Sequence, residues 1–142
     1  SPRVHRLRGS MNLSDEILER MVSVAKKQSQ RAYAPYSNFP VGAAVLTREG
    51  EIVGGCNVEN ASYGLTICAE RNAIARMVAE GGHEIVALVV YTPTSTPAAP
   101  CGACRQVIHE LGRQAEVLCF CDGDGRIATG IAQLLASPFD LE

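Results

Sequence analysis

A seven-residue run, Ile85-Val-Ala-Leu-Val-Val-Tyr91, constrains the fold more than any other stretch of this 142-residue chain. The run contains no charged residue and is dominated by β-branched side chains, so neither face of a strand built from it suits water. It therefore predicts a strand that is buried on both faces. Such a strand needs neighbouring strands and a layer of helices on each side of the sheet, which predicts an α/β fold.

Capping and periodicity predict the elements around this strand. Ser14 precedes two acidic residues, a typical helix start, and apolar residues recur at helical spacing from Ile17 to Ala25, which predicts a helix to about Ala32. The other predicted elements are a hairpin over 41–47 and 52–58, helices over 68–79 and 104–111, strands over 117–121 and 126–129, and a helical turn over 131–135. This order predicts one mixed sheet with helices on its faces.

The first ten residues, SPRVHRLRGS, carry three arginines and no acid. They resemble a disordered or non-native leader that ends in Gly-Ser, so we expect residues 11–142 to form the single domain. Subtracting these three arginines from the thirteen basic residues leaves ten, against fifteen acidic residues. This acidic balance argues against a protein that binds nucleic-acid phosphates and favours a small ligand.

No apolar run approaches the roughly 20 residues of a membrane-spanning helix, and no signal-peptide pattern precedes the domain. Six cysteines occur, at positions 56, 68, 101, 104, 119 and 121. Without a secretory signal, metal ligands or free thiols are favoured over disulfides. We therefore expect a cytoplasmic protein, with neither a membrane nor a nucleic acid as its partner.

Three of the cysteines are spaced for metal binding. Cys101-Gly-Ala-Cys104 begins one predicted helix and Cys68 begins another, and the N-terminus of a helix stabilises a thiolate. Three sulfurs that meet at one zinc ion would leave a fourth position for water, as in catalytic zinc sites. The alternative is a closed structural zinc with a fourth cysteine, although Cys56, Cys119 and Cys121 lie in predicted strands and are interpreted as small buried hydrophobic residues.

Glu70 makes the catalytic interpretation sharper. Two residues after Cys68, its carboxylate can reach a metal-bound water without binding the metal, as a general base does. Taken alone, an acid in a first helical turn would more often be a solvated side chain that favours the helix dipole. The pattern Cys-Ala-Glu followed by Pro-Cys-Gly-Ala-Cys (residues 68–70 and 100–104) also matches the zinc deaminases.

With the further motifs Tyr36–Ala44 and Gly55–Tyr63, the chain from about Asn12 to Leu141 resembles the cytidine deaminases, in the small subfamily whose zinc ligands are all cysteines. The resemblance implies a three-layer α/β/α fold with a mixed five-stranded sheet. It also implies a homotetramer with shared active sites. The implied reaction is zinc-dependent hydrolysis of cytidine and 2′-deoxycytidine to uridine and 2′-deoxyuridine with release of ammonia, in pyrimidine salvage.

The resemblance implies roles for the residues around the metal. Cys68, Cys101 and Cys104 would bind one Zn²⁺ per subunit, and Glu70 would shuttle protons between water and the cytosine. Arg71 would donate hydrogen bonds to the thiolates and offset their negative charge. Three thiolates donate much electron density to a metal, so a nearby cation is physically expected, and by position alone either Arg71 or Arg105 could supply it.

The resemblance also implies a nucleoside site. Asn57 and Glu59 would hold the ribose 3′-hydroxyl, Phe39 would pack against the nucleoside, and backbone groups of Ala69 and Ala99 would lie near the pyrimidine edge and the leaving ammonia. Without the resemblance, Asn57 and Glu59 fit equally well as polar residues at the end of a strand. In the same way, Phe39 would fit a core position better than a ligand site.

Three further residues would act on a neighbouring subunit. Ala61 and Tyr63 would reach the sugar, and Phe139 would close over the base.

Two other functions compete with this prediction. One is a deaminase of a different aminopyrimidine, such as the similarly sized blasticidin S deaminases, and the other is a non-catalytic module with a structural zinc. The motif from Asn57 to Tyr63 favours a nucleoside over the former.

Overall fold

The computed structural model describes residues 4–6 and 12–141, and its centre is a mixed five-stranded sheet. Across the sheet the strands are β4 (Ile52–Cys56), β3 (Gly42–Thr47), β5 (Ile85–Tyr91), β6 (Glu116–Phe120) and β7 (Ile127–Gly130). The β5–β6 pair is parallel and the other neighbouring pairs are antiparallel. The predicted mixed sheet is confirmed, and β5 has the bounds that the sequence predicted.

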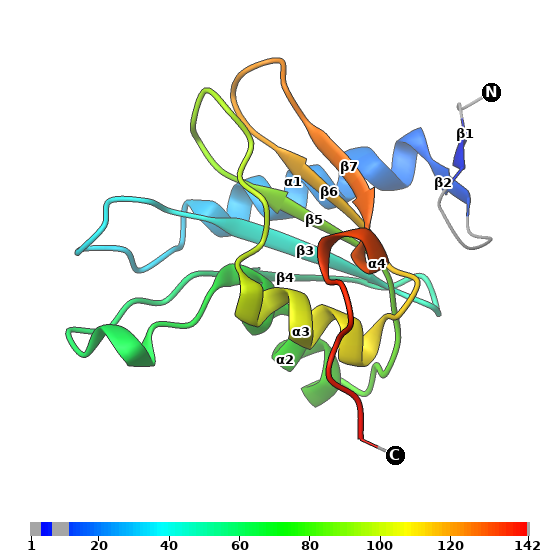
Figure 1. Ribbon diagram of the computed structural model, residues 1–142. Coiled ribbons are helices and arrows are strands. Elements are labelled where there is room, and N and C mark those ends of the chain that lie inside the picture. Colours follow the sequence, from blue (N-terminus) through cyan, green and yellow to red (C-terminus); the bar gives the residue numbers. More distant parts are fainter. Residues whose placement is uncertain (1–3, 7–11, 142) are drawn as a thin grey trace.

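Helices cover both faces of this sheet (Figure 1). Helix α1 (Asp15–Ser29) packs on one face against β3, β4 and β5. Helices α2 (Ala69–Ala79) and α3 (Gly102–Leu111) lie on the other face, where the short α4 (Ile131–Leu134) contacts α3. The predicted three-layer α/β/α fold is therefore confirmed.

Strand β5 contributes side chains to both cores of the protein. Leu88 and Val90 belong to the core on the side of α2 and α3, whereas Ala87 and Val89 belong to the core under α1. All seven residues of the strand are buried. Alternate side chains of a strand point to opposite faces, so an uninterrupted apolar sequence is what a strand between two helical layers requires.

The boundaries of the helices differ in detail from those predicted. Ser14 caps α1 as expected, with its hydroxyl accepting a hydrogen bond from the Ile17 N–H at 3.1 Å. The helix ends at Ser29 rather than near Ala32, because Tyr33 forms a bridge with Val58 that takes the chain out of the helix. In α3 the helix begins at Gly102, two residues earlier than predicted.

Three small elements were not predicted. A 3₁₀ helix, η1, spans Tyr63–Leu65, and β2 (Asn12–Ser14) pairs antiparallel with β1 (Val4–Arg6). Strand β1 belongs to the segment interpreted as a leader, whose other residues lie outside the described residues, so the origin of residues 1–10 stays a prediction. No helix within residues 4–6 and 12–141 is both long enough and apolar enough to cross a membrane.

Gly42 lets α1 approach the sheet closely, which generates a stability prediction. A Cβ atom at Gly42 would lie 1.7 Å from the Ala25 carbonyl oxygen and 2.7 Å from the Ser29 nitrogen, so the backbone of α1 would have to move. We expect Gly42→Ala to lower the free energy of unfolding by about 1–3 kcal/mol or more in urea titrations. Gly64→Ala is the matched control, because a Cβ there meets nothing within 4 Å. Equal stability of the two variants would contradict this packing.

Candidate metal centre and adjoining cavity

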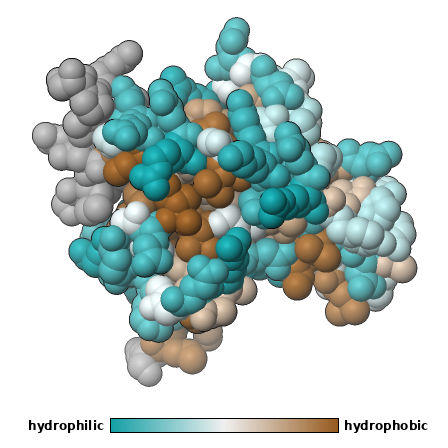
Figure 2. All heavy atoms as spheres, turned by 180° about the vertical axis from the view of Figure 1, so that it is seen from behind, coloured by the Kyte–Doolittle hydropathy of each residue, from teal (hydrophilic) through white to brown (hydrophobic). Residues whose placement is uncertain are grey.

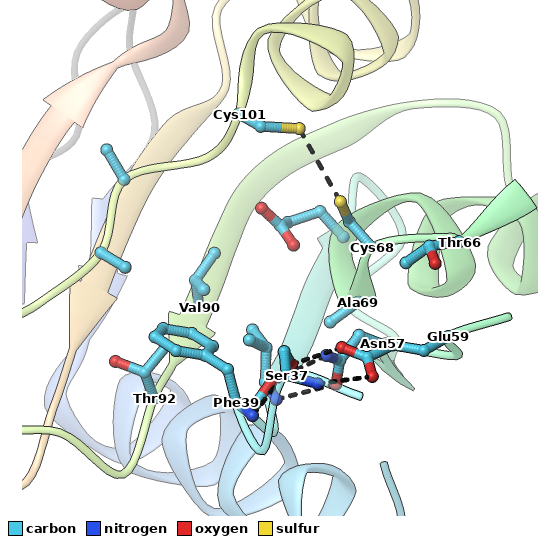
Figure 3. Close-up of a pocket in the computed structure, with 14 residues that line it drawn as sticks. Ser37, Phe39, Asn57, Glu59, Thr66, Cys68, Ala69, Val90, Thr92 and Cys101 are labelled. Carbon is cyan, nitrogen blue, oxygen red and sulfur yellow. Dashed lines mark hydrogen bonds between the residues drawn. The ribbon is translucent and has the colours of Figure 1, made fainter. Parts of the chain in front are cut away.

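The three predicted zinc ligands lie together at the N-termini of two helices. Cys68 is the N-cap of α2, Cys101 is the N-cap of α3, and Cys104 lies in the first turn of α3. Their Sγ atoms all lie within 4.8 Å of one another, and those of Cys68 and Cys101 are 3.7 Å apart (Figure 3). Because α2 and α3 pack side by side, cysteines that are distant in the sequence meet at one point.

Negative charge on these sulfurs is stabilised by their surroundings. The Arg71 Nη2 donates to the Cys68 Sγ at 3.5 Å, and both helix N-termini face the group. The pKa of the Cys68 thiol is lowered to about 5. The largest cause is a hydrogen bond from Cys104, and the contact with Arg71 lowers it further. The same contact with Cys68 raises the pKa of Cys104. One thiolate therefore forms readily, while a second costs more free energy unless a cation lies among the sulfurs.

The donor set fits zinc. Thiolate sulfur is a preferred ligand of Zn²⁺, and three protein ligands are typical of catalytic zinc sites. Within the part of the chain that the structure describes, no fourth cysteine, histidine or acid belongs to this group. The fourth ligands considered from the sequence, Cys56, Cys119 and Cys121, lie elsewhere in the fold.

These three other cysteines differ in their surroundings. Cys119 is fully buried in β6, as predicted, and Cys56 is half-buried at the end of the edge strand β4. The prediction for Cys121 is wrong. It follows β6 instead of lying in it, and its half-buried thiol faces backbone carbonyl oxygens, the nearest of which, that of Gly125, is at 3.3 Å.

Glu70 is a buried acid beside the sulfurs. It lies in the first turn of α2, is 5% exposed, and lines the same cavity as Cys68 and Cys101 without belonging to the metal-ligand group. The alternative of a solvated first-turn acid is therefore wrong. Burial is the main cause that raises the pKa of Glu70 to about 7, with a further contribution from the Cys68 charge. A carboxyl with a pKa near neutrality can both accept and return a proton.

Cys68, Cys101 and Glu70 line a cavity of about 250 Å³. The predicted site residues that line it are Phe39, Asn57, Glu59, Cys68, Ala69, Glu70, Ala99 and Cys101. In Figure 3 the cavity has two ends, with Cys68 and Cys101 at one and Ser37, Phe39, Asn57 and Glu59 at the other. A concave site with few polar groups at opposite ends suits a small molecule that is bound at both ends.

Six residues that line this cavity were not predicted: Ser37, Val41, Thr66, Val90, Thr92 and Ala98. The sequence held a signal for two of them. Thr92 directly follows the buried strand β5, a position from which a side chain commonly reaches a ligand site, and Ser37 belongs to the same motif as Phe39. The others are small or apolar residues whose type carries no indication of a cavity.

Asn57 and Glu59 hold the loop that carries Phe39. The Asn57 side chain donates to the Phe39 carbonyl at 2.9 Å and accepts from the Val41 N–H at 2.8 Å. The Glu59 carboxylate accepts from the N–H groups of Tyr36 and Ser37, at 2.9 and 3.2 Å, and from the Ser37 hydroxyl. Both residues thus fix this end of the cavity, a function that their position at a strand end did not reveal.

Ala61, Tyr63 and Phe139 lie outside the cavity of their own chain. All three are exposed, Tyr63 by 75% and Phe139 by 68%. The Tyr63 ring meets that of Tyr36 edge-on, with the ring centroids 6.0 Å apart. Any contact of these residues with a bound nucleoside must therefore come from another copy of the chain or from a movement of the chain.

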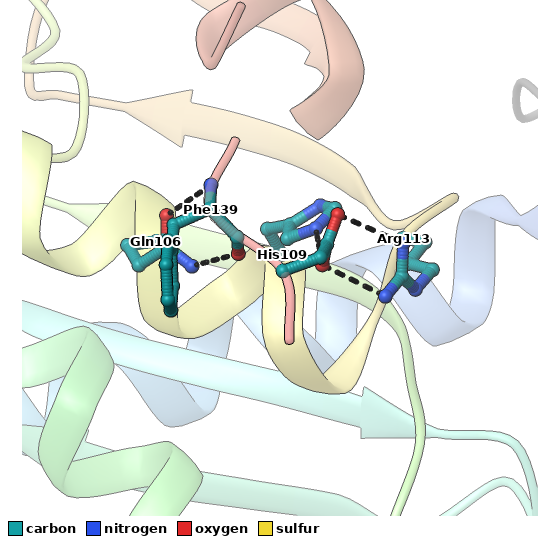
Figure 4. A network of polar contacts seen from close by, with 5 residues as sticks. Gln106, His109, Arg113 and Phe139 are labelled. Atoms are coloured by element: carbon teal, nitrogen blue, oxygen red, sulfur yellow. Dashed lines mark hydrogen bonds and ion pairs between the residues drawn. The ribbon is translucent and has the colours of Figure 1, made fainter. Parts of the chain in front are cut away.

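Hydrogen bonds and ion pairs hold the C-terminal segment against α3 (Figure 4). The Gln106 side chain donates to the Phe139 carbonyl at 2.9 Å and accepts from the Phe139 N–H at 3.4 Å. The carboxylate of Asp140 accepts from the Arg113 Nη2 at 2.8 Å and pairs with the buried His109 at 2.8 Å. The main chain of the segment is thus fixed while the Phe139 ring stays exposed.

The comparisons with known proteins agree with this geometry. Residues 15–121 match the family model described as the cytidine and deoxycytidylate deaminase zinc-binding region. The chain belongs to this deaminase family. The matched range includes the three sulfurs and Glu70, so zinc is the metal that the family and the donor set indicate together.

Relatives in the family cover nearly the whole chain. The cytidine deaminase of Sporosarcina psychrophila is 44% identical over 127 residues, which are 88% of this chain and 93% of the relative. Among solved structures, the cytidine deaminase of Burkholderia pseudomallei is 45% identical with a TM-score of 0.81, covering 85% of this chain and 98% of that one. The cytidine deaminase of Mycobacterium tuberculosis is 39% identical with a TM-score of 0.75, covering 87% and 98%.

Proposed function

We propose that this protein hydrolyses cytidine and 2′-deoxycytidine to uridine and 2′-deoxyuridine, with release of ammonia. The observation that carries the proposal is one cavity lined by Cys68, Cys101 and the buried Glu70 at one end and by Asn57 and Glu59 at the other. The sulfur of the buried Cys104 lies behind this lining, within 4.8 Å of the other two sulfurs. The relatives named cytidine deaminase, at 44% and 45% identity, support the same activity.

The chemistry follows from the residues around the sulfurs. Cys68, Cys101 and Cys104 would hold Zn²⁺, which supplies a Lewis acid that makes water acidic enough to act as a nucleophile at neutral pH. Glu70 would take a proton from the attacking water and deliver it to N3 of cytosine. It would then move the second proton of that water, from the hydroxyl added at C4, to the amino group, which leaves as ammonia. Its raised pKa of about 7 suits both directions of transfer. Arg71 would offset the thiolate charge through its contact with Cys68.

The other end of the cavity suits the sugar. The Asn57 side-chain N–H that the loop contact leaves free would donate to the oxygen of the ribose 3′-hydroxyl. The Glu59 carboxylate would accept from the same hydroxyl with a lone pair that the loop does not use. Phe39 would pack against the nucleoside. The backbone of Ala69, at the start of α2, would contact the pyrimidine edge, and that of Ala99 would lie near the ammonia.

The assembly proposed for this enzyme is a homotetramer with shared sites. Apolar side chains are exposed on the two loops beside the cavity mouth, namely Tyr33, Tyr36, Val58, Tyr63, Leu65 and Ile67. A further apolar area lies on the α1 face of the molecule, surrounded by hydrophilic side chains (Figure 2). Exposed apolar surface of this kind favours association, and Ala61, Tyr63 and Phe139 would then reach a neighbour's cavity.

A cytoplasmic role in pyrimidine salvage fits these features. All six cysteines are free, which suits a reducing compartment. The competing activities are deamination of blasticidin S or another aminopyrimidine, and a module in which zinc has a purely structural role. The experiments below separate these from the proposed function.

The proposed activity is tested by ammonia release from cytidine, 2′-deoxycytidine, CMP and blasticidin S, measured side by side. We expect turnover of the two nucleosides. Glu70→Gln should keep one zinc per chain by elemental analysis and lose activity by about 10²–10⁴-fold, because it removes the proton carrier alone. The control is Glu19→Gln, an exposed acid on α1. Full activity of Glu70→Gln would refute its role, and turnover of blasticidin S alone would refute the nucleoside substrate.

Shared active sites are tested by mixing two defective chains. Phe139→Ala and Glu70→Gln should each be impaired alone, whereas a 1:1 mixture that is dissociated and reassembled should regain up to roughly a quarter of the wild-type rate. Recovery requires that a cavity with an intact Glu70 receive Phe139 from another chain.

The homotetramer itself is tested by light scattering, which should give four times the 15.1 kDa chain mass. A monomeric mass, or no recovery on mixing, would contradict shared sites.

A further inference from the structure

The hydroxyl of Ser37 connects two groups at the sugar end of the cavity, the Glu59 carboxylate and the Phe39 N–H. It donates to one oxygen of the Glu59 carboxylate and accepts a hydrogen bond from the Phe39 N–H at 3.0 Å. Ser37 also lines the cavity (Figure 3). Its single donor and one of its acceptor sites are thus both committed to the loop, so its orientation is fixed by two partners.

The backbone of the loop is shaped around the same carboxylate. The other oxygen of Glu59 accepts the consecutive N–H groups of Tyr36 and Ser37, at 2.9 and 3.2 Å. Asn38 has a left-handed backbone with φ of 53°, a conformation that asparagine tolerates better than most residues, and this turns the chain so that Phe39 can reach the Ser37 hydroxyl. The carboxylate is therefore held by main-chain donors at one oxygen and by one side chain at the other.

This arrangement has a consequence for Glu59. The hydrogen bond from Ser37 is the largest cause that lowers the pKa of the Glu59 carboxyl, so the group stays ionised as an acceptor. An exposed carboxylate would otherwise rotate freely, and a ligand would have to meet the entropy cost of fixing it. The oxygen next to Ser37 still has a lone pair for a second donor.

We propose that Ser37 is a positioning residue that holds the Glu59 carboxylate for a sugar 3′-hydroxyl and thereby sets the preference of the site for nucleosides that carry this hydroxyl. The inference rests on the proposed function, because it takes Glu59 to be a ligand of the sugar. It adds that Ser37, which was not among the predicted site residues, determines how well this contact discriminates. The two main-chain contacts remain in any Ser37 variant, so the side chain can be tested by itself.

The test compares cytidine with 3′-deoxycytidine, which lacks the relevant hydroxyl. In the wild type, kcat/KM should favour cytidine. Ser37→Ala should reduce this preference about tenfold, mainly through a higher KM for cytidine with kcat nearly unchanged, because hydrogen bonds to charged groups contribute this much to discrimination. Ser37→Thr keeps the hydroxyl and should restore the preference. Ser23→Ala, at an exposed serine of α1, is the matched control.

Binding of the products provides a measurement that needs no turnover. Calorimetry should show that Ser37→Ala weakens uridine about tenfold and leaves 3′-deoxyuridine nearly unchanged. An unchanged preference in Ser37→Ala, or an equal loss for both compounds of each pair, would overturn the inference, since the latter is what mere disruption of the loop predicts. A wild-type protein that deaminates neither nucleoside would instead refute the proposed function.

Discussion

The arrangement of the site depends on bringing three cysteine sulfurs within 4.8 Å of one another despite the repulsion between thiolates. Two helix N-termini that meet side by side make this feasible, because each directs free N–H groups and a partial positive charge at the sulfurs. Arg71 adds a full positive charge beside Cys68. The pKa of Cys68 is lowered and that of Cys104 is raised, so the helix N-termini and Arg71 stabilise one thiolate. A bound cation would be needed to stabilise the others.

The rest of the fold keeps these two helices in place. Helix α2 lies against β3 and β4 at Gly55, where a Cβ atom would lie 2.4 Å from the Ala73 nitrogen, so the separation of helix and sheet is fixed by backbone contact. Helix α3 follows β5 through a loop that ends in the buried Pro100, whose carbonyl accepts from the Arg105 Nε at 2.8 Å. Arg105 also donates to the Leu134 carbonyl at 2.9 Å, which connects the start of α3 to α4.

The sequence predicted those features that depend on local pattern or on paired motifs. Strand β5 follows from its apolar run, the start of α1 from Ser14, and the meeting of Cys68 with Cys101 and Cys104 from motifs shared with a known family. Features that depend on contacts between distant segments escaped it. The end of α1 is set by the bridge between Tyr33 and Val58, which lie 25 positions apart.

The contacts of Asn57 and Glu59 with the loop before β3 were hidden for the same reason. Residue type indicated polar groups near a ligand, but the partners of those groups are backbone atoms and the Ser37 hydroxyl of a segment some twenty positions away. Burial also changed one interpretation. A first-turn acid such as Glu70 is normally solvated, and the structure encloses it beside the sulfurs, which raises its pKa toward the range that proton transfer needs.

We expect Cys68, Cys101 and Cys104 to bind the metal and to leave one coordination position for a small molecule. X-ray absorption spectroscopy of the zinc-loaded protein tests it directly, because zinc–sulfur and zinc–oxygen shells differ in distance. We predict three sulfur neighbours and one oxygen or nitrogen neighbour around the zinc, with the oxygen or nitrogen shell changing when a nucleoside analogue is added. Four sulfur neighbours that do not respond to the analogue would contradict it and would indicate a structural zinc.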